Sequence, residues 1–247
     1  MKFKTDGLVI FETAVGETDR YISILTKKGV VRAFVRGAYN IKNPKSAATR
    51  LLCYSDFVIY EGKESFTVDT AESKEMFIGL RKDIVKMSLA QYFCQLCYEL
   101  CSDEGYSGAY LKTMLNSLYM LCKGNKDETL IKAVFELRML AEAGYMPDLK
   151  CCKGCGKFED ENMMFVPDED CIYCSDCAQA SKYKSIKTGL GVTAAMRHAI
   201  YADDRQIFAF NLSKPSINIL SLAAEDYTLK KTEKKLPTLD FYKTMAI

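Results

Sequence analysis

Six of the eleven cysteines lie within CCKGCGKFEDENMMFVPDEDCIYCSDC, residues 151–177. Two C-x-x-C pairs stand 18 residues apart in this stretch. This spacing is typical of a zinc site, because each C-x-x-C turn directs two thiolates at one cation and two turns complete a tetrahedral shell. Gly156 suits the tight turn that closes the first pair, since glycine adopts positive φ at little cost. We predict one structural Zn²⁺ held by Cys152, Cys155, Cys174 and Cys177.

Two further cysteines leave the ligand set open. Cys171 and Cys174 also form a C-x-x-C pair, and Cys151 directly precedes Cys152. We prefer Cys174 and Cys177 as the second pair, because that choice leaves two separate knuckles, but Cys171 can replace either of them. A closed shell of four thiolates offers no position for water or substrate, so the predicted ion is structural rather than catalytic.

The cysteine segment is also strongly acidic. Seven Asp or Glu and no Lys or Arg lie between Phe158 and Asp176. A hairpin with this charge repels phosphates. We therefore expect the zinc module not to bind nucleic acid itself.

The rest of the chain lacks the residue sets of an enzyme. The single histidine, His198, stands in AAMRHAIYADD with no nucleophile motif nearby. The chain has no GxxxxGK[ST], and GLGVTAAM lacks the GxGxxG pattern, so nucleotide binding has little support. Cys94, Cys97 and Cys101 have helical spacing and are interpreted as a buried stripe. We predict that the protein is not an enzyme.

The basic residues are concentrated in one segment. Eight Lys or Arg and no acid occupy residues 20–50, which favours a polyanionic partner. Tyr21, Phe34 and Tyr39 are interleaved with these cations, the combination that a platform for single-stranded nucleic acid needs. Arg20 is set aside, because Asp19 or Glu17 can pair with it. We predict contacts to DNA phosphates, without base-specific readout, by Lys27, Lys28, Arg32, Arg36, Lys42, Lys45 and Arg50.

Residues 1–79 are expected to position those cations on a small barrel. Five short runs alternate or are rich in β-branched and aromatic residues: GLVIFETAV, RYISILT, GVVRAFVRGA, CYSDFVIYEG and SFTVDTAES. Within the third run, Val31, Ala33 and Val35 share one face, and the residues between them share the other. The segment NIKNPKSAATR has no periodicity and is predicted to be a flexible basic loop.

From residue 80 the hydrophobic period becomes helical. Residues 80–147 predict a bundle of three helices, the third beginning at Asn125 or Asp127 and ending at Gly144. Residues 148–180 form the zinc-finger module. Residues 181–247 predict a C-terminal helical segment that packs on the bundle, with a short strand QIFAFNL within it. The predicted fold is α+β and multidomain.

Composition places the chain among ordinary globular proteins. The formal net charge is +2, 49% of the residues are hydrophobic, and no apolar run approaches the ~20 residues that span a bilayer. The first residues lack a secretory cleavage pattern. We expect a cytoplasmic protein without a membrane segment, in which cysteines are thiols or metal ligands rather than disulfides.

Several of these motifs together resemble the RecO family of bacterial recombination-mediator and DNA-repair proteins. VGETDRYISILTKKGVVRAFVRGA is similar to the opening signature of that family, and NPKSAATRLLCYSDFVIYEG to its basic loop and following strand. CKGCG and CSDC fall where many members carry a zinc finger. The order of barrel, helices, zinc module and helices covers essentially the whole chain.

The resemblance implies an N-terminal OB-fold followed by a helical domain with the zinc finger. It implies a non-enzymatic, nucleoid-associated protein that binds single- and double-stranded DNA and anneals complementary strands. With RecR, and in some members RecF, such proteins help RecA load onto DNA coated by single-strand binding protein, whose C-terminal tail some members contact.

Two other classes of function are weighed against this one. The first is a protein-binding adaptor that docks through the acidic zinc module and whose DNA binding depends on a partner. The second is a zinc-dependent nucleic-acid enzyme, which would need a metal ion that carries water.

Overall fold

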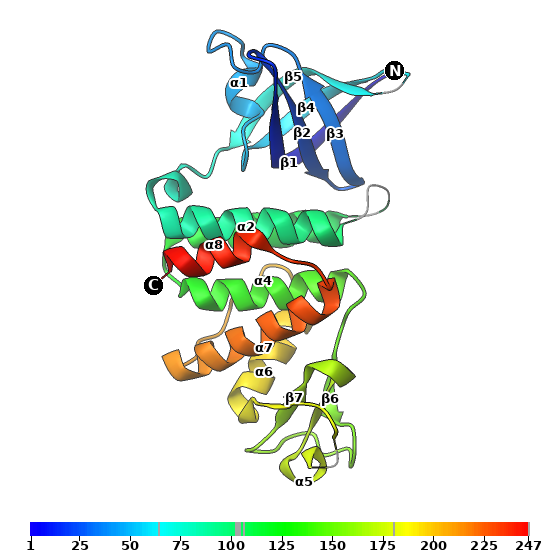
Figure 1. The fold of residues 1–247 in the computed structure, drawn as a ribbon, viewed down its shortest axis with the longest axis vertical. Helices are drawn as coiled ribbons and strands as arrows, with labels where there is room; N and C mark the ends of the chain where they lie inside the picture. Colours follow the sequence, from blue (N-terminus) through cyan, green and yellow to red (C-terminus); the bar gives the residue numbers. More distant parts are fainter. Residues whose placement is uncertain (64, 102–104, 106, 180, 247) are drawn as a thin grey trace. The chain divides into compact units, whose positions relative to one another are not determined.

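The structure is a computed structural model, and it describes residues 1–63, 65–101, 105, 107–179 and 181–246 (Figure 1). The chain divides into two compact units. The first comprises Met1–Cys122 together with Leu236–Ile247, and the second comprises Lys123–Lys235. The sequence predicts domain boundaries at residues 79, 147 and 180. These boundaries stay a prediction.

The first unit begins with a closed five-stranded barrel, as the sequence predicts. Its strands follow the spatial order β1-β2-β3-β5-β4, and β4 returns to pair antiparallel with β1. β3 and β5 close the barrel as a parallel pair. This is the five-stranded Greek-key arrangement of an OB-fold. The strands are β1 (Lys2–Val15), β2 (Asp19–Thr26), β3 (Gly29–Val35), β4 (Tyr54–Glu61) and β5 (Phe66–Glu75).

The barrel core follows the predicted alternation. Along β3, Ala33 and Val35 are fully buried, Arg32 is exposed and Phe34 is half-buried. The buried side chains come from every strand of the barrel and supply the hydrophobic driving force for closure. They include Val9, Ile22, Ile24, Phe57, Ile59 and Val68. The outer face of β3 is therefore free to carry polar groups.

The basic segment between β3 and β4 is more ordered than predicted. A four-residue helix, α1 (Lys45–Ala48), stands where the sequence indicated a loop without regular structure. The Asn43 side chain starts this turn by accepting a hydrogen bond from the Lys45 N–H at 3.0 Å, while its amide donates to the Gly37 carbonyl at 2.9 Å. Because side-chain to backbone hydrogen bonds stabilise this helix, rather than a buried apolar face, hydrophobic periodicity did not predict it.

The helical part of the first unit is completed by a late segment of the chain. η1 (Ile78–Lys82) leads into α2 (Ile84–Leu100), and α3 (Gly108–Lys123) follows. α8 (Pro237–Met245) packs along α2 (Figure 1), and the Gln95 side chain accepts hydrogen bonds from the Thr238 N–H and Oγ1. Residues more than a hundred positions apart thus form one helical layer.

The second unit is built from three helices that pack on one another and a small sheet that packs against two of them, α6 (Gly189–Tyr201) and α7 (Lys214–Thr232). α4 (Glu128–Glu142) packs against α6 and α7. Asp127 caps α4 by accepting a hydrogen bond from the Thr129 N–H, and Gly144 beyond its end has a φ of +88°, both as predicted. The sheet order is β6-β8-β7-β9, with β6 (Asp148–Cys152), β7 (Met164–Val166), β8 (Cys171–Tyr173) and β9 (Ile186–Lys187). Two short helices, η2 (Pro167–Glu169) and α5 (Ser175–Ala178), complete it.

The prediction of a strand at QIFAFNL is wrong. Residues 206–212 form turns and irregular backbone, and Ile207 and Phe208 are buried by packing instead of by strand pairing. The Lys126 ammonium donates to the Phe210 carbonyl at 2.7 Å and to Asn211 Oδ1 at 2.8 Å, so side chains take the place of ladder bonds. Within the described residues, no helix is long and apolar enough to cross a membrane.

A buried ion-pair cluster joins α4 to α7. The Lys132 ammonium lies 2.9 Å from Glu136 Oε1 and 2.9 Å from Glu225 Oε2. Lys132 is 2% exposed, and the Glu136 side chain is fully buried. Because charges transferred from water are costly, each member depends on the others for its solvation.

We predict that Lys132→Met lowers the free energy of unfolding by about 3–5 kcal/mol, because it removes the buried ammonium that pairs with both Glu136 and Glu225. Urea denaturation of the full chain measures this change. Replacing the whole cluster, with Lys132→Met, Glu136→Leu and Glu225→Leu together, should recover most of the loss. A single variant as stable as wild type would contradict the dependence of the helix pair on this cluster.

Candidate metal centre and nucleic-acid interface

The structure brings together the four cysteines that the spacing selected. The ligand atoms of Cys152, Cys155, Cys174 and Cys177 all lie within 4.8 Å of one another, and Cys155 Sγ is 3.6 Å from Cys174 Sγ. The parallel pairing of β6 with β8 produces this meeting, because Cys152 ends β6 and Cys174 follows β8. In the described part of the chain, this is the group of Cys, His, Asp or Glu side chains that is arranged to hold a metal ion.

The other cysteines stand outside this group. Cys171 is buried on β8, with its Sγ 4.0 Å from Glu169 Oε2, and it does not share the cluster. Cys94, Cys97 and Cys101 are buried, as the helical spacing predicted. Burial raises the pKa of Cys97 well above its usual value and keeps this thiol protonated.

The donor set and the space between the knuckles fit a thiophilic cation. A Cβ built on Gly154 would lie 2.8 Å from Cys177 Sγ, so the backbone must approach the second knuckle at a glycine. Gly156 has a φ of +74°, which supports the tight turn predicted there. Four closely placed sulfurs are the ligand set that Zn²⁺ accepts in structural sites.

The ionisation of the cluster also favours a cation. Burial opposes ionisation of Cys152, but hydrogen bonds from the backbone N–H groups of Cys174, Cys155 and Gly154 lower its pKa to about 6. The other three thiols of the cluster raise the pKa of Cys177 to about 12. Without a cation, Cys152 thus favours the thiolate, whereas the raised pKa values of Cys155 and Cys177 favour the thiol. A divalent cation would offset the repulsion between adjacent thiolates and allow all four to form.

Arg197 braces the first knuckle, a role without a signal in the sequence. From α6, its Nε donates to the Leu149 carbonyl at 2.7 Å, and its Nη2 donates to the carbonyls of Lys150 and Phe158. Its guanidinium carbon lies 4.3 Å from the Phe158 ring centroid. The hairpin is thereby attached to a helix that begins more than thirty residues after the first cysteine pair.

We predict that Gly154→Ala reduces zinc content, because its Cβ collides with Cys177 and separates the two knuckles. Metal analysis of the purified full chain, with a chromophoric chelator as competitor, measures the loss. Gly156→Ala is the matched control: it has open space and only an unfavourable φ, so it should cost about 1 kcal/mol of stability and keep one bound zinc.

Cys155→Ser and Cys177→Ser should both lower metal content and melting temperature, whereas equal zinc in all four variants would contradict the assignment.

Six of the seven predicted DNA-contact cations lie in two groups on the barrel, and the seventh, Arg32, lies between these groups. Lys27 and Lys28 occupy the β2–β3 turn, where Ser107 bonds to the backbone at Lys27 and Gly29. Lys27 also pairs with Asp6 at 3.4 Å. At the far end of β3 stands the second group, to which we give the name loop-end cations: Arg36, Lys42, Lys45 and Arg50. Arg32 lies between the groups on the outer face of β3, with its guanidinium carbon 5.5 Å from the Tyr98 ring centroid.

The loop-end cations present exposed side chains, with one exception. Lys45 is half-buried, and its ammonium donates to the Val68 carbonyl at 3.0 Å. Tyr39 and Tyr21 expose much of their rings, and Tyr21 packs edge-on against Phe34 at a centroid distance of 5.2 Å. Exposed rings beside cations can stack bases while the cations contact the backbone.

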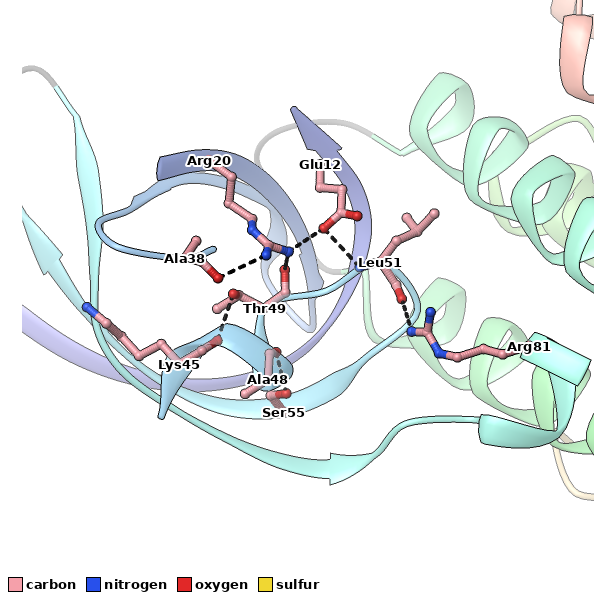
Figure 2. Close-up of polar contacts among 9 residues, drawn as sticks. All are labelled: Glu12, Arg20, Ala38, Lys45, Ala48, Thr49, Leu51, Ser55 and Arg81. Carbon is pink, nitrogen blue, oxygen red and sulfur yellow. Dashed lines mark hydrogen bonds and ion pairs between the residues drawn. The ribbon is translucent and has the colours of Figure 1, made fainter. Parts of the chain in front are cut away.

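A buried arginine organises the loop that carries these cations (Figure 2). Arg20 is 1% exposed, and its guanidinium donates to Glu12 Oε2 at 2.6 Å, to the Ala38 carbonyl at 3.1 Å and to the Thr49 carbonyl at 3.3 Å. Glu12 in turn accepts the Leu51 N–H at 3.3 Å. The sequence predicted an acidic partner for Arg20, and that partner is Glu12 instead of Asp19 or Glu17.

The same loop is fastened at two further points (Figure 2). Ser55 Oγ donates to the Ala48 carbonyl at 2.8 Å, and Arg81 donates to the Leu51 carbonyl at 2.8 Å. The Lys45 carbonyl accepts both the N–H and the Oγ1 of Thr49. The loop-end cations thus project from a backbone fixed by side chains of β1, β2, β4 and η1.

We predict that Arg20→Gln lowers the free energy of unfolding by about 3 kcal/mol, because it leaves backbone carbonyls and a carboxylate without their buried donor. Glu12→Gln should cost less, since this side chain is one-third exposed and its amide can still accept. Urea denaturation measures both. Hydrogen exchange at residues 38–52 should accelerate in the arginine variant, and unchanged protection there would contradict the organising role.

These features define the class of protein: a multidomain α+β chain in which a small closed barrel of the OB type is joined to helices and to a four-cysteine module. Family comparison matches residues 1–77 to the N-terminal and residues 81–240 to the C-terminal part of recombination protein O. The chain therefore belongs to the RecO family, which assigns it to DNA repair and recombination.

Individual relatives agree over nearly the whole chain. The DNA repair protein RecO of Acetivibrio thermocellus is 32% identical over 243 residues, covering 98% of this chain and 96% of the relative. That of Symbiobacterium thermophilum is 28% identical over 247 residues, covering 98% and 97%. That of Alkaliphilus metalliredigens is 32% identical over 209 residues, covering 83% of both chains.

Proposed function

We propose that the protein is a non-enzymatic recombination mediator that binds single- and double-stranded DNA through its barrel and anneals complementary strands. The observation that carries this proposal is the set of loop-end cations on a loop fixed by Arg20. A fixed basic surface contacts phosphates without losing as much conformational entropy as a mobile loop would. Membership in the RecO family supports a DNA substrate.

The proposed contacts are to the sugar–phosphate backbone. Arg36, Lys42 and Arg50 are exposed, and Arg32 extends the same charge along β3. Tyr21 and Tyr39 offer rings for unpaired bases. Such contacts bind without regard to sequence, which suits a protein that must hold any single strand until its complement arrives.

The remaining parts of the proposal concern partners, metal and organisation. With RecR, the protein helps RecA load onto DNA coated by single-strand binding protein, and RecF and the C-terminal tail of the single-strand binding protein are further partners. One Zn²⁺ on Cys152, Cys155, Cys174 and Cys177 stabilises the zinc module at residues 148–180. The barrel at 1–79, the helices at 80–147 and the helical segment at 181–247 complete the proposed domains. The site of action is the bacterial nucleoid.

A second candidate function, that of a protein-binding adaptor, is favoured by one feature of the zinc module. Phe158 is 59% exposed, and its neighbour Glu159 and the nearby Glu161 are also exposed. An exposed ring among acids suits a partner with apolar and basic side chains. Charge reversal of Glu159, Asp160 and Glu161 that abolished RecR binding and kept annealing would favour this role for the module.

We predict that a labelled single-stranded oligonucleotide binds with a steep salt dependence that flattens when Arg32, Arg36, Lys42 and Lys45 are changed to Gln. Losing four phosphate contacts should reduce the slope of log K against log salt by about 3. Fluorescence anisotropy at several salt concentrations measures it. The matched control changes Lys2, Lys74, Lys82 and Lys86, which lie in the same unit, and should keep the slope. Equal slopes for both variants would reject the barrel as the DNA platform.

A further inference from the structure

A basic segment directly follows the zinc module, and we call its three lysines the module lysines. Residues 177–202 contain no Asp or Glu, in contrast to the acidic hairpin before them. Lys182, Lys184 and Lys187 fall within six positions of this segment, and Tyr183 stands between the first two. Cations with an interleaved ring are the composition that binds single strands.

All four side chains face solvent. Lys182, Lys184 and Lys187 are exposed, and Tyr183 is 54% exposed. Within the residues that the structure describes, these three ammonium groups have no carboxylate partner. Their positive charge is therefore available to a bound anion.

The backbone of this segment is fixed on both sides. At its start, Ser181 Oγ donates to Glu169 Oε1 at 3.1 Å and accepts the Tyr183 N–H at 3.2 Å. At its end, β9 pairs with β7, and both the N–H and the Oγ1 of Thr188 donate to the Met163 carbonyl. The lysines and the tyrosine are thus presented by an anchored loop rather than by a free tail.

A groove beside the segment offers hydrogen-bonding groups. Its volume is about 420 Å³, and Lys187 is one of the residues that line it. The described residues that line it include no carboxylate, and most are small or polar: Asn162, Met164, Ser175, Ala178, Gln179, Ser185 and Lys187. Hydroxyl and amide groups beside a lysine can contact phosphate oxygens.

The acidity of the preceding hairpin is largely neutralised inside the second unit. Five of its seven acids are in ion pairs with four lysines, two of which come from α7. These pairs are Lys157 with both Asp160 and Asp176, Lys153 with Glu169, Lys230 with Asp168 and Lys231 with Asp170. Repulsion of phosphates, expected from composition, is thereby weakened beside the basic segment.

We infer that Lys182, Tyr183, Lys184 and Lys187 form a second surface for single-stranded DNA, separate from the barrel. This inference rests on the proposed DNA-binding function and extends it to the segment that follows the zinc module. The lysines contact phosphates, and the Tyr183 ring stacks on an unpaired base. Two surfaces on one chain allow two strands to be held at once, which annealing requires.

The test compares three variants of the full chain: Lys182→Gln with Lys184→Gln and Lys187→Gln, the matched control Lys150→Gln with Arg205→Gln and Lys235→Gln, and the barrel variant described above. The first two variants remove exposed cations from the same unit. Zinc content and melting temperature confirm that each is folded. Anisotropy gives the salt slope, and quenching of paired fluorescent oligonucleotides gives the annealing rate.

Loss of the three module lysines should flatten the single-strand salt slope by about 2 and slow annealing about tenfold, while the control matches wild type. Tyr183→Ala should slow annealing, and Tyr183→Phe should not. Ultraviolet crosslinking of a bromodeoxyuridine oligonucleotide to wild-type protein should label the peptide that contains Tyr183.

The outcomes separate this inference from the function on which it rests. Wild-type slope, annealing and crosslinks in the module variants, with loss in the barrel variant, would overturn the second surface and keep the proposed function. Loss in the module variants alone would retain the second surface and reject the barrel platform. Absence of single-strand binding by the wild-type chain would overturn both.

Discussion

The barrel depends on one buried guanidinium. Arg20 emerges from β2 into the interior of the unit and donates to two loop carbonyls and to Glu12, which lies on the neighbouring strand. A cation buried to this degree needs acceptors for its terminal guanidinium nitrogens, so the β3–β4 connection has to fold back over it and present the Ala38 and Thr49 carbonyls. The positions of α1 and of the cations around it follow from that requirement. The buried hydrogen bonds of Arg20 thus determine where the exposed cations of the β3–β4 connection lie.

In the second unit, contacts from outside the small sheet hold its hairpins together. This unit has a four-stranded sheet of very short strands, which would be marginal alone. The approach of Gly154 to Cys177, the hydrogen bonds from Arg197 and the ion pairs from α7 hold its hairpins in place. The four sulfurs meet at the centre of these contacts. Metal coordination would then complete a site that the polypeptide already brings together.

Local patterns in the sequence predicted much of this structure. The alternation around Val31 and Val35 fixed the inner face of β3, Asp127 and Gly144 marked the ends of α4, and the cysteine spacing identified the four sulfurs that meet. Each of these features depends on residues close together in the chain. QIFAFNL misled, because β-branched and aromatic residues serve a buried turn as well as a strand when side chains such as Lys126 satisfy the backbone.

The features that sequence reasoning missed depend on long-range partners. Arg197 braces a hairpin that precedes it by some forty residues, and Glu12 is the partner of Arg20 only because β1 and β2 pair in one register. Neither residue stands in a motif. The pairing of α8 with α2 likewise has no local signal, since both helices offer only the common helical period.

That last pairing has a consequence for how the chain is made. The polypeptide leaves the first unit after Cys122, builds the second unit from 113 residues, and returns at Leu236. During synthesis, α2 emerges from the ribosome long before α8. The side of α2 that α8 covers therefore stays exposed while the whole cysteine module folds. The second unit can mature first, and the first unit closes last. A chain interrupted near residue 235 would lack α8 and leave α2 uncovered, a species suited to capture by chaperones.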